Sequence, residues 1–287
     1  MSTWKQTGRR ALRGALEARK RARVARTDPL CVYDVAEKLG PDVKFVAVNS
    51  FGGMYVRTSE TILVPSLRPP GRQAYTCGHE LGHWFFDHGT RVDDISTLDE
   101  EMWDDPDERL AHLFSGFLLA PPWTVKDAFK RRVWQPASCS PLQAYSIAVQ
   151  LGMGYESLVN HLLRSLRLIS SSQAKHLSSM TPKKIRSMVL GEDHPGHLVI
   201  ADRAWRAVPV DLSVGDLAIL PDNVGLEGRS VTLQGSLKKY GIIVEGRQPG
   251  ITRAELKDGS WATFLRVCRK EFEGRNIYRH MEDPDVD

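Results

Sequence analysis

Residues 79–83 read His-Glu-Leu-Gly-His, a spacing that could hold a metal ion. On an α-helix, histidines four residues apart lie on one face, one turn apart, so the imidazoles of His79 and His83 can reach the same ion. Glu80 is rotated by about 100° from His79, beside the ion, where a carboxylate can take a proton from water. The pattern predicts a zinc-dependent hydrolase with two histidine ligands and a glutamate general base.

The flanks of this motif predict that it is buried. Leu81 and the aromatic run at 84–86 follow a stretch of small residues, so the helix is apolar on almost every side. Histidine and glutamate are placed in such a helix when they are paired, hydrogen-bonded or metal-bound. The alternative, a surface helix with two solvated histidines, agrees less well with these flanks.

A hydrolytic zinc site usually has three protein ligands and leaves the fourth position to water. Glu108 is the third ligand that the sequence favours, because it begins a segment with one apolar helical stripe. Pro106 marks the start of this second helix and Pro121 its end. His112, one turn after Glu108, is expected to be a buried histidine, with a place at the metal as the alternative.

Other carboxylates compete with Glu108. Asp87 lies on the motif helix a full turn beyond the metal, where a capping or supporting role is expected. The rest belong to an acidic stretch without periodicity, which indicates a solvated loop: Asp93, Asp94, Glu100 and Glu101.

Residues 72–83 read Arg-Gln-Ala-Tyr-Thr-Cys-Gly-His-Glu-Leu-Gly-His, and Glu108 is followed by the pattern Ala-x-x-Phe-x-x-x-Leu-Leu-x-Pro. The arrangement resembles that of the ImmA/IrrE metallopeptidases, over roughly residues 10–170. The resemblance implies that His79, His83 and Glu108 hold Zn²⁺, that Glu80 is catalytic, and that the substrate is a helix-turn-helix repressor. Two departures lie on the second helix, where His112 replaces the common Asn and Ser115-Gly116 replaces Ala-Ala.

Peptide hydrolysis also needs a hydrogen-bond donor for the oxyanion of the tetrahedral intermediate. The sequence offers four candidates without ranking them: Tyr55, Arg72, Tyr75 and His88.

The composition is that of a globular protein, with 41 % hydrophobic and 26 % charged residues among 287. The first 26 residues carry nine Lys or Arg and one Glu, a charge of +8, so the remainder carries −4 of the overall +4. The four cysteines are widely scattered, which argues against a disulfide framework and a thiolate metal site. We expect a cytoplasmic protein without a membrane partner, because no apolar run is long enough to span a bilayer.

The expected fold class is α+β, in four parts. Residues 1–135 are predicted to form a basic amphipathic helix and a zincin-like peptidase core, with short strands at 44–48, 53–56 and 61–64. Residues 136–170 are predicted to form a helix-turn-helix-like module, for which contact with DNA is weakly supported. Residues 171–190 are predicted to be a serine-rich linker, and residues 191–287 a β-rich sensor or docking domain of seven short strands.

Two functions from different classes follow. The first is a zinc endopeptidase that cleaves a DNA-binding transcriptional repressor and so derepresses stress, mobile-element or prophage genes. The second is a non-catalytic regulatory or toxin-antitoxin partner that binds a repressor or DNA, with the zincin fold structural. The intact Glu80 favours the enzyme, because a binding module needs no general base.

Overall fold

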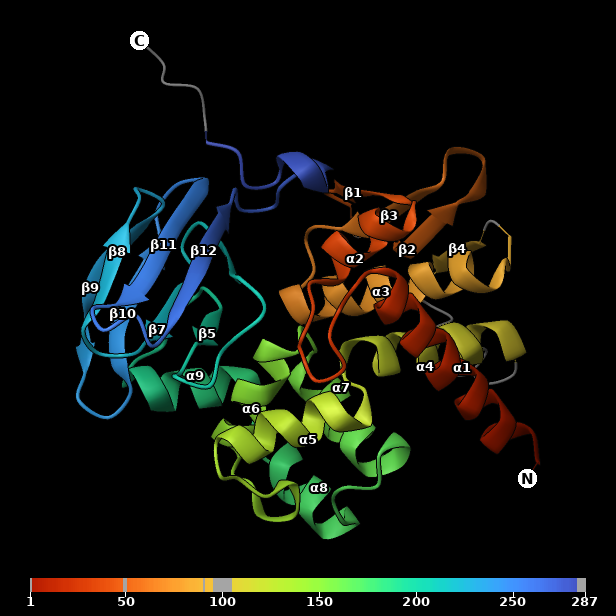
Figure 1. Cartoon of the computed structure of the whole chain (residues 1–287), viewed down its shortest axis with the longest axis horizontal. Coiled ribbons are helices and arrows are strands. Elements are labelled where there is room, and N and C mark those ends of the chain that lie inside the picture. The colour runs from red at the N-terminus through yellow and green to blue at the C-terminus, as the bar shows by residue number, and fades with distance from the viewer. Residues whose placement is uncertain (1, 49–50, 90, 95–104, 283–287) are drawn as a thin grey trace.

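The computed structural model describes residues 2–48, 51–89, 91–94 and 105–282. Helices and sheets are mixed along the chain, so the fold is α+β, as predicted (Figure 1). No described helix combines the length and the apolar character that a bilayer crossing requires.

The N-terminal part is built on a five-stranded sheet of order β13-β1-β3-β2-β4. Its strands are β1 (Asp42–Val46), β2 (Phe51–Val56), β3 (Thr61–Pro65), β4 (Arg91–Asp94) and β13 (Gly274–Arg275). β1 and β3 pair in parallel and the other neighbours pair antiparallel. The three strands expected before the motif helix are confirmed, within a few residues at their ends.

Four helices pack around this sheet: α1 (Ser2–Arg21), α2 (Val32–Leu39), α3 (Pro70–Phe86) and α4 (Pro106–Leu119). α3 lies against β2 and β3, and α4 lies between α3 and α1. α1 fits closely on α4 because Ala11, Ala15 and Ala18, spaced at helical intervals, are fully buried.

The basic character of α1 is not confined to its outer face. Arg19 is buried and donates hydrogen bonds to the Leu118 carbonyl, at 2.7 Å, and to the Asp28 carbonyl. Burial lowers the pKa of Arg19 to about 10, against the opposing effect of nearby Asp28. This arginine therefore ties α1 to α4 and does not contribute to a solvated basic surface.

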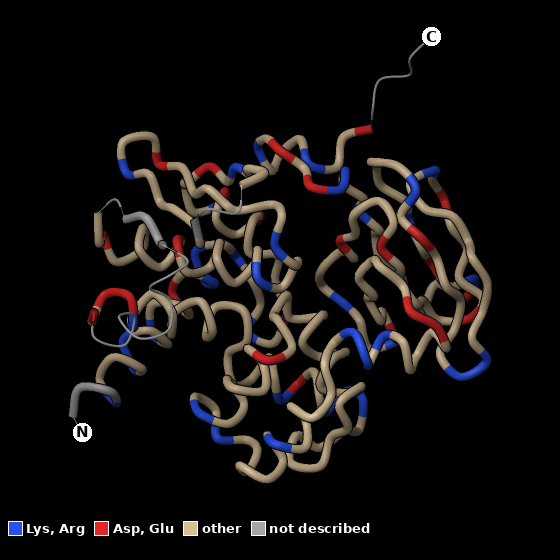
Figure 2. The backbone as a smooth tube through the Cα atoms, turned by 180° about the vertical axis from the view of Figure 1, so that it is seen from behind, with Lys and Arg blue, Asp and Glu red and all other residues tan. Residues whose placement is uncertain are grey.

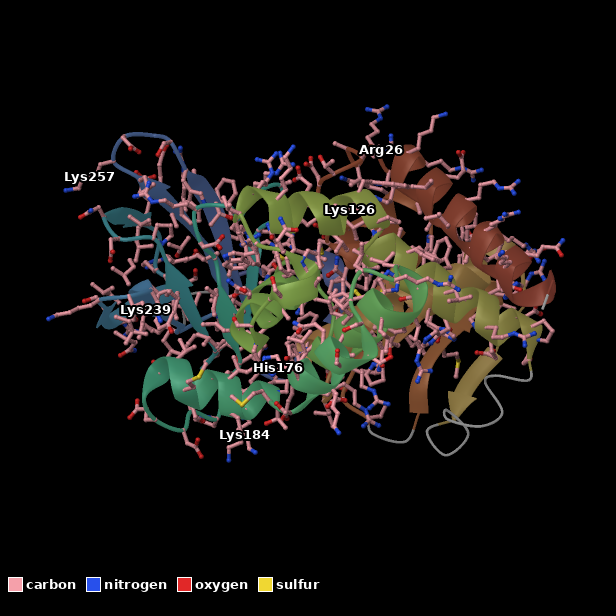
Figure 3. All side chains as sticks on the ribbon, turned by 90° about the horizontal axis from the view of Figure 1, so that it is seen from below. Arg26, Lys126, His176, Lys184, Lys239 and Lys257 are labelled. Carbon is pink, nitrogen blue, oxygen red and sulfur yellow. The ribbon has the colours of Figure 1, made fainter. Side chains whose placement is uncertain are left out.

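A helical part follows, comprising α5 (Pro122–Arg131), α6 (Pro141–Gln150), α7 (Tyr155–Asn160), α8 (Ser171–Ser178) and α9 (Pro182–Leu190). α7 continues into a π-helical turn, His161–Ser165. The two helices expected on either side of residues 152–154 are confirmed as α6 and α7. Lys126 and Lys184 extend outward from this part, and basic residues recur over all parts of the described backbone (Figures 2 and 3).

The linker expected at 171–190 is wrong for the described structure, because α8 and α9 occupy it. Ser170, just before this segment, and Thr181, within it, cap the two helices. Ser170 accepts from the Gln173 amide at 3.2 Å and Thr181 from the Lys184 amide at 3.3 Å. Leu177 and Ile185 are fully buried in the main core, so the segment is packed.

Residues beyond α9 form two four-stranded sheets. One has the order β5-β7-β10-β9 and the other β6-β12-β11-β8. The strands are β5 (Leu198–Ile200), β6 (Val210–Ser213), β7 (Leu217–Leu220), β8 (Val224–Glu227), β9 (Val231–Leu237), β10 (Gly241–Gly246), β11 (Gly250–Leu256) and β12 (Ala262–Cys268). The expected hairpin is confirmed, because β11 and β12 pair antiparallel around Gly259, which has φ +69°.

Two expectations for this region need correction. β8 was not expected, because its residues Val-Gly-Leu-Glu give a short, weakly β-type run. Residues 207–210 form a β-type run in the sequence that predicts a strand, but the strand begins at Val210, since Ala207 has φ +66° and turns the chain before it.

The chain then returns to the N-terminal sheet. β13 pairs with β1, placing Arg275 opposite Lys44. The Phe272 ring lies 6.1 Å from that of Phe45, and the Arg279 guanidinium lies 4.7 Å from the Phe45 ring centroid. The sequence placed these residues in the C-terminal β-rich part, whereas the structure has them completing the N-terminal sheet (Figure 1).

Candidate metal centre

The motif helix α3 is defined at both ends by its sequence. Pro70 occupies its first position, where the missing N–H costs no hydrogen bond. Asp87 ends it in the left-handed conformation, φ 58°, and its carboxylate lies 2.9 Å from the Arg57 guanidinium. Asp87 therefore caps the helix and pairs with an arginine, which agrees with the capping role expected for it.

The second helix, α4, brings Glu108 to the motif. The Asp105 carboxylate caps its N-terminus by accepting from the Asp107 amide at 2.8 Å, and Pro106 takes the first position. Glu108 therefore stands in the first turn of a firmly initiated helix.

The side chains of His79, His83 and Glu108 converge. His79 Nε2 lies 3.1 Å from Glu108 Oε2, His83 Nε2 lies 3.4 Å from Glu108 Oε1, and the two Nε2 atoms are 3.1 Å apart. Among the described residues these three form the group that could hold a metal ion, with ligand atoms all within 4.8 Å of one another. Two imidazole nitrogens and one carboxylate oxygen match the ligand chemistry of a catalytic zinc site.

Glycine on α3 allows the two helices to approach this closely. A Cβ atom on Gly78 would lie 2.6 Å from Ser115 Oγ, so a larger residue there would push α4 away. The Ser115 hydroxyl donates to the Tyr75 carbonyl at 2.8 Å. The departure from Ala-Ala at 115–116 thus has a structural role, because Ser115 joins the two helices that carry the ligands.

Glu80 is fully buried between α3 and the sheet. A Cβ atom on Gly53 of β2 would lie 2.8 Å from Glu80 Oε1 and 2.4 Å from Thr76 Cγ2. The absence of a side chain at Gly53 therefore lets β2 lie directly against the carboxylate expected to act as base. The same strand carries Gly52, which lines the cleft described below.

His88 supports the ligand His83 from outside. The Nδ1 atoms of the two rings are 3.1 Å apart, and His88 Nε2 lies 3.5 Å from Asp107 Oδ1. His88, one of the four candidate oxyanion donors, instead lies behind His83, a candidate ligand. No spacing rule signals this role, because residue 88 lies beyond the helix that carries the motif.

The charge distribution favours a carboxylate ligand at Glu108. Burial alone would raise the pKa of Glu108, but hydrogen bonds with His79 and His83 outweigh it and hold the pKa well below its usual range. Glu108 is therefore ionised at neutral pH, as a metal ligand must be.

His112 lies beside the group and is not part of it. Its ring is 5.2 Å from the Tyr75 ring, and the Tyr75 hydroxyl donates to its backbone carbonyl at 2.8 Å. Burial, with smaller contributions from His79 and His161, lowers the pKa of His112 to about 4. His112 is thus a neutral imidazole outside the ligand group, half-buried where a fully buried side chain was expected.

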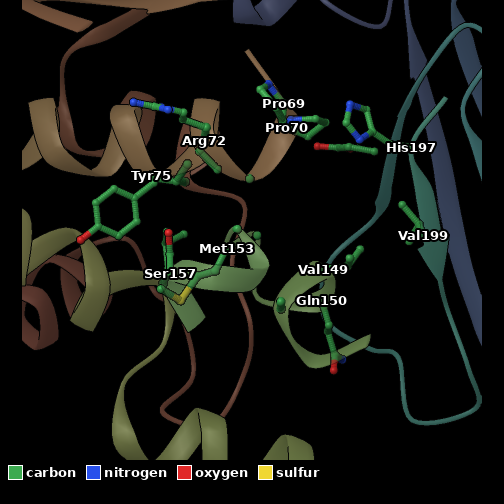
Figure 4. A pocket seen from close by; sticks show the side chains of 18 of the residues that line it. Pro69, Pro70, Arg72, Tyr75, Val149, Gln150, Met153, Ser157, His197 and Val199 are labelled. Carbon is green, nitrogen blue, oxygen red and sulfur yellow. The ribbon is translucent and has the colours of Figure 1, made fainter. Parts of the chain in front are cut away.

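A cleft of about 790 Å³ opens onto the site. Of the four oxyanion donors proposed from sequence, Tyr75 and Arg72 line it, whereas Tyr55 and His88 are outside its lining. His79 and His112 form part of its wall. The cleft continues past α3 to His197 and Val199 of the β-rich part (Figure 4).

The remaining candidate ligands are placed as follows. Asp93 and Asp94 end strand β4, whose backbone pairs with β2, so this part of the acidic stretch is not a loop. Glu100 and Glu101 lie outside the described residues. The four cysteines are free.

Comparison with known protein families gives one match. Residues 36–162 match the family model of the IrrE N-terminal-like domain, Peptidase M78. The matched segment begins in α2 and ends at the π-helical turn after α7, so it contains all of the candidate site. No curated protein matches the chain in sequence.

Proposed function

We propose, from the Peptidase M78 domain that this chain carries over residues 36–162, that the protein is a zinc-dependent endopeptidase. The observation that carries the proposal is the convergence of His79, His83 and Glu108 within 4.8 Å, with Glu80 on the adjacent face of the same helix. A purely structural or binding module would need neither this donor set nor the buried carboxylate beside it.

The roles of the side chains follow from their positions. Zinc bound by the three ligands would supply Lewis acidity, which polarises a peptide carbonyl and acidifies water. Glu80 takes the proton from the attacking water and returns it to the leaving amine. Burial of Glu80 against Gly53 holds the carboxylate in one position and limits its solvation, which suits a base whose proton must be transferred directly.

His112 is our choice for the oxyanion donor. Its neutral imidazole lines the cleft together with His79, which places it beside the path of a bound substrate. Tyr75 supports it, because its hydroxyl already donates to the His112 carbonyl and its ring packs beside the imidazole. Arg72 stands two helical turns before His79, too far along α3 for this role.

For the substrate we propose a helix-turn-helix transcriptional repressor, cleaved so that its target genes are derepressed. This part of the proposal rests on the resemblance to the ImmA/IrrE metallopeptidases. The support for DNA contact through α6 and α7 is limited to basic residues such as Arg164, which is exposed beyond α7.

The metal assignment is tested by elemental analysis of purified protein. We expect about one zinc per chain in the wild type. Glu108→Ala leaves two ligands and should lose most of this zinc, whereas Glu192→Ala, which removes an exposed carboxylate, should keep it. Glu100→Ala tests the competing ligand; loss of zinc there, with retention in Glu108→Ala, would refute the assignment.

The reaction is tested with Glu80→Gln, which keeps the size of the side chain and removes the base. The variant should retain zinc, while cleavage of a candidate helix-turn-helix repressor falls by at least about 100-fold. Co-expression followed by intact-mass analysis would detect the fragment. If the wild type and Glu80→Gln derepress the target equally and no fragment forms, the protein is a non-catalytic partner that sequesters the repressor.

A further inference from the structure

The cleft that opens onto the metal centre extends well beyond it. It is lined in turn by the open face of α3, by the turn between α6 and α7, and by β5 with the segment before it. Figure 4 shows Pro70 at the start of α3 facing His197 across this space, with Met153 and Ser157 on the opposite wall. A polypeptide substrate that extends beyond the cleaved bond can therefore contact this surface.

Arg72 occupies a particular place on this surface. It precedes His79 by seven residues, two helical turns, so both side chains lie on the same face of α3, about 10 Å apart along the axis. The Arg72 side chain is exposed and lines the cleft. In Figure 4 it extends along α3 to the same side as Tyr75, away from His197.

The acidic side chains of the cleft are largely engaged elsewhere. Asp216 accepts from the backbone amides of His197 and Ser213, each at 2.8 Å. Asp211 holds Arg266 through two hydrogen bonds of 2.6 and 2.8 Å. Glu156 is exposed in the first turn of α7, where a negative charge is favoured by the helix dipole.

The guanidinium of Arg72 differs from these groups. Within the described ranges, it makes no ion pair with a carboxylate, in contrast to Arg266, which pairs with Asp34 and Asp211. An arginine held on the metal-facing side of α3 without an acidic partner is available to a carboxylate that enters with a ligand.

We propose that Arg72 is a specificity-determining residue that binds an acidic side chain of an extended polypeptide substrate. The inference rests on the proposed peptidase function and deepens it. An extended chain advances by about 3.3 Å per residue, so the distance of about 10 Å from His79 places the acidic residue about three positions from the cleaved bond. The acidic residue therefore belongs to the part of the substrate that extends from the cleaved bond toward the N-terminus of α3.

The proposal predicts a preference that can be measured without catalysis. The probes are two pools of fluorescein-labelled dodecapeptides of otherwise random sequence, one enriched in Asp and Glu and the other in Lys and Arg. Their binding to zinc-loaded Glu80→Gln is followed by fluorescence anisotropy. We expect the acidic pool to bind about fivefold more tightly, the scale of one partly exposed ion pair.

Charge changes at Arg72 should control this preference. Arg72→Gln in the Glu80→Gln background should abolish it, and Arg72→Glu should reverse it in favour of the basic pool. Arg13→Gln, which removes an exposed arginine from α1, should leave it unchanged. Zinc content, measured for each variant, should equal that of the parent, because Arg72 is not a ligand.

Cleavage by the zinc-loaded wild type gives the second readout. Sequencing the products of a random peptide library should show Asp or Glu enriched about three positions from the cut, and Arg72→Glu should replace it with Lys or Arg. Cleavage without this enrichment overturns the proposal and leaves the peptidase function intact. Tighter binding of the acidic pool without any cleavage overturns the peptidase function and leaves Arg72 as a determinant of peptide binding. Equal binding of the two pools, binding of neither, or a preference that Arg72→Glu does not alter, also overturns the proposal.

Discussion

The ring of His83 faces Glu108 with one nitrogen and His88 with the other. Its Nε2 lies 3.4 Å from Glu108 Oε1, and its Nδ1 lies 3.1 Å from His88 Nδ1. When Nε2 serves as a ligand, Nδ1 carries the proton and donates a hydrogen bond to Nδ1 of His88. His88 then carries its own proton on Nε2, 3.5 Å from the Asp107 carboxylate. A ligand, a second histidine and an acid thus form one chain that fixes the orientation of His83.

Replacing His88 should weaken metal binding without removing a ligand. His88→Ala leaves the His83 ring without its partner, and we expect the zinc affinity to fall about tenfold. Competition with a chromophoric chelator measures this directly. His176→Ala, which removes an exposed histidine from α8, is the matched control (Figure 3). An unchanged affinity in His88→Ala would show that packing alone orients His83.

The close approach of α3 and α4 predicts a steric effect at Gly78. Gly78→Ala places a methyl group 2.6 Å from Ser115 Oγ and should destabilise the protein by about 1–3 kcal/mol, measured by urea unfolding. Adding Ser115→Ala should recover part of this loss, because the clashing atom is removed. Gly8→Ala on α1, where a Cβ meets nothing within 4 Å, should be neutral or stabilising. Equal effects at residues 8 and 78 would contradict the close approach.

Acid sensitivity should depend on His161. Burial lowers the pKa of His161 from 6.5 to about 4, while its ring contacts the Ala120 carbonyl at 2.9 Å. The unfolded chain therefore binds a proton at a higher pH than the folded chain does. The contribution of His161 to the free energy of unfolding is fully present above pH 6.5. It is lost as the pH falls towards 4, and it amounts to up to about 3 kcal/mol.

His161→Gln should flatten the dependence of the unfolding free energy on pH between 6.5 and 4, because glutamine does not titrate. Urea midpoints at half-unit pH intervals would show it. His176→Gln should leave the slope as it is, since that side chain is exposed. A slope that His161→Gln does not change would assign the acid sensitivity to other groups.

The returning C-terminal segment should contribute to the stability of the N-terminal sheet. Phe272 packs edge-on against Phe45, which is 1 % exposed, so Phe272→Ala opens a gap over that ring. We expect a loss of about 2 kcal/mol, less than for a fully buried phenylalanine. Tyr278→Ala, at a side chain 52 % exposed, is the control. If Phe272→Ala costs no more than Tyr278→Ala, the segment is peripheral to the sheet.

The convergence of the candidate ligands could be predicted from the sequence where it depends on local geometry. His79 and His83 are four residues apart on one helix, so their convergence follows from helical periodicity alone. The position of Glu108 beside these histidines does not follow from periodicity, because the apolar stripe of α4 predicts a buried helix but not how that helix packs against α3. The approach of the two helices depends on Gly78 and Ser115, whose importance is visible only in the assembled structure.

Other features had no sequence signal. His88 and Gly53 act on the site through contacts between different elements, which spacing does not encode. The serine-rich segment around Ser170 was predicted to be a linker because cap residues and linker residues have the same composition. The structure distinguishes them by the burial of Leu177, seven residues after the Ser170 cap, and of Ile185, four residues after the Thr181 cap.

The pairing of β13 with β1 has a consequence for synthesis. Lys44 and Arg275 are opposite each other, yet they lie 231 positions apart in the sequence. At about 5–20 residues per second, a ribosome takes roughly 10–50 seconds to translate this interval. During that time the nascent sheet lacks one edge strand and the side chains that later cover Phe45. The last partner of β1 thus arrives after all the residues of the candidate metal centre have been translated, so a newly made N-terminal part completes its sheet late.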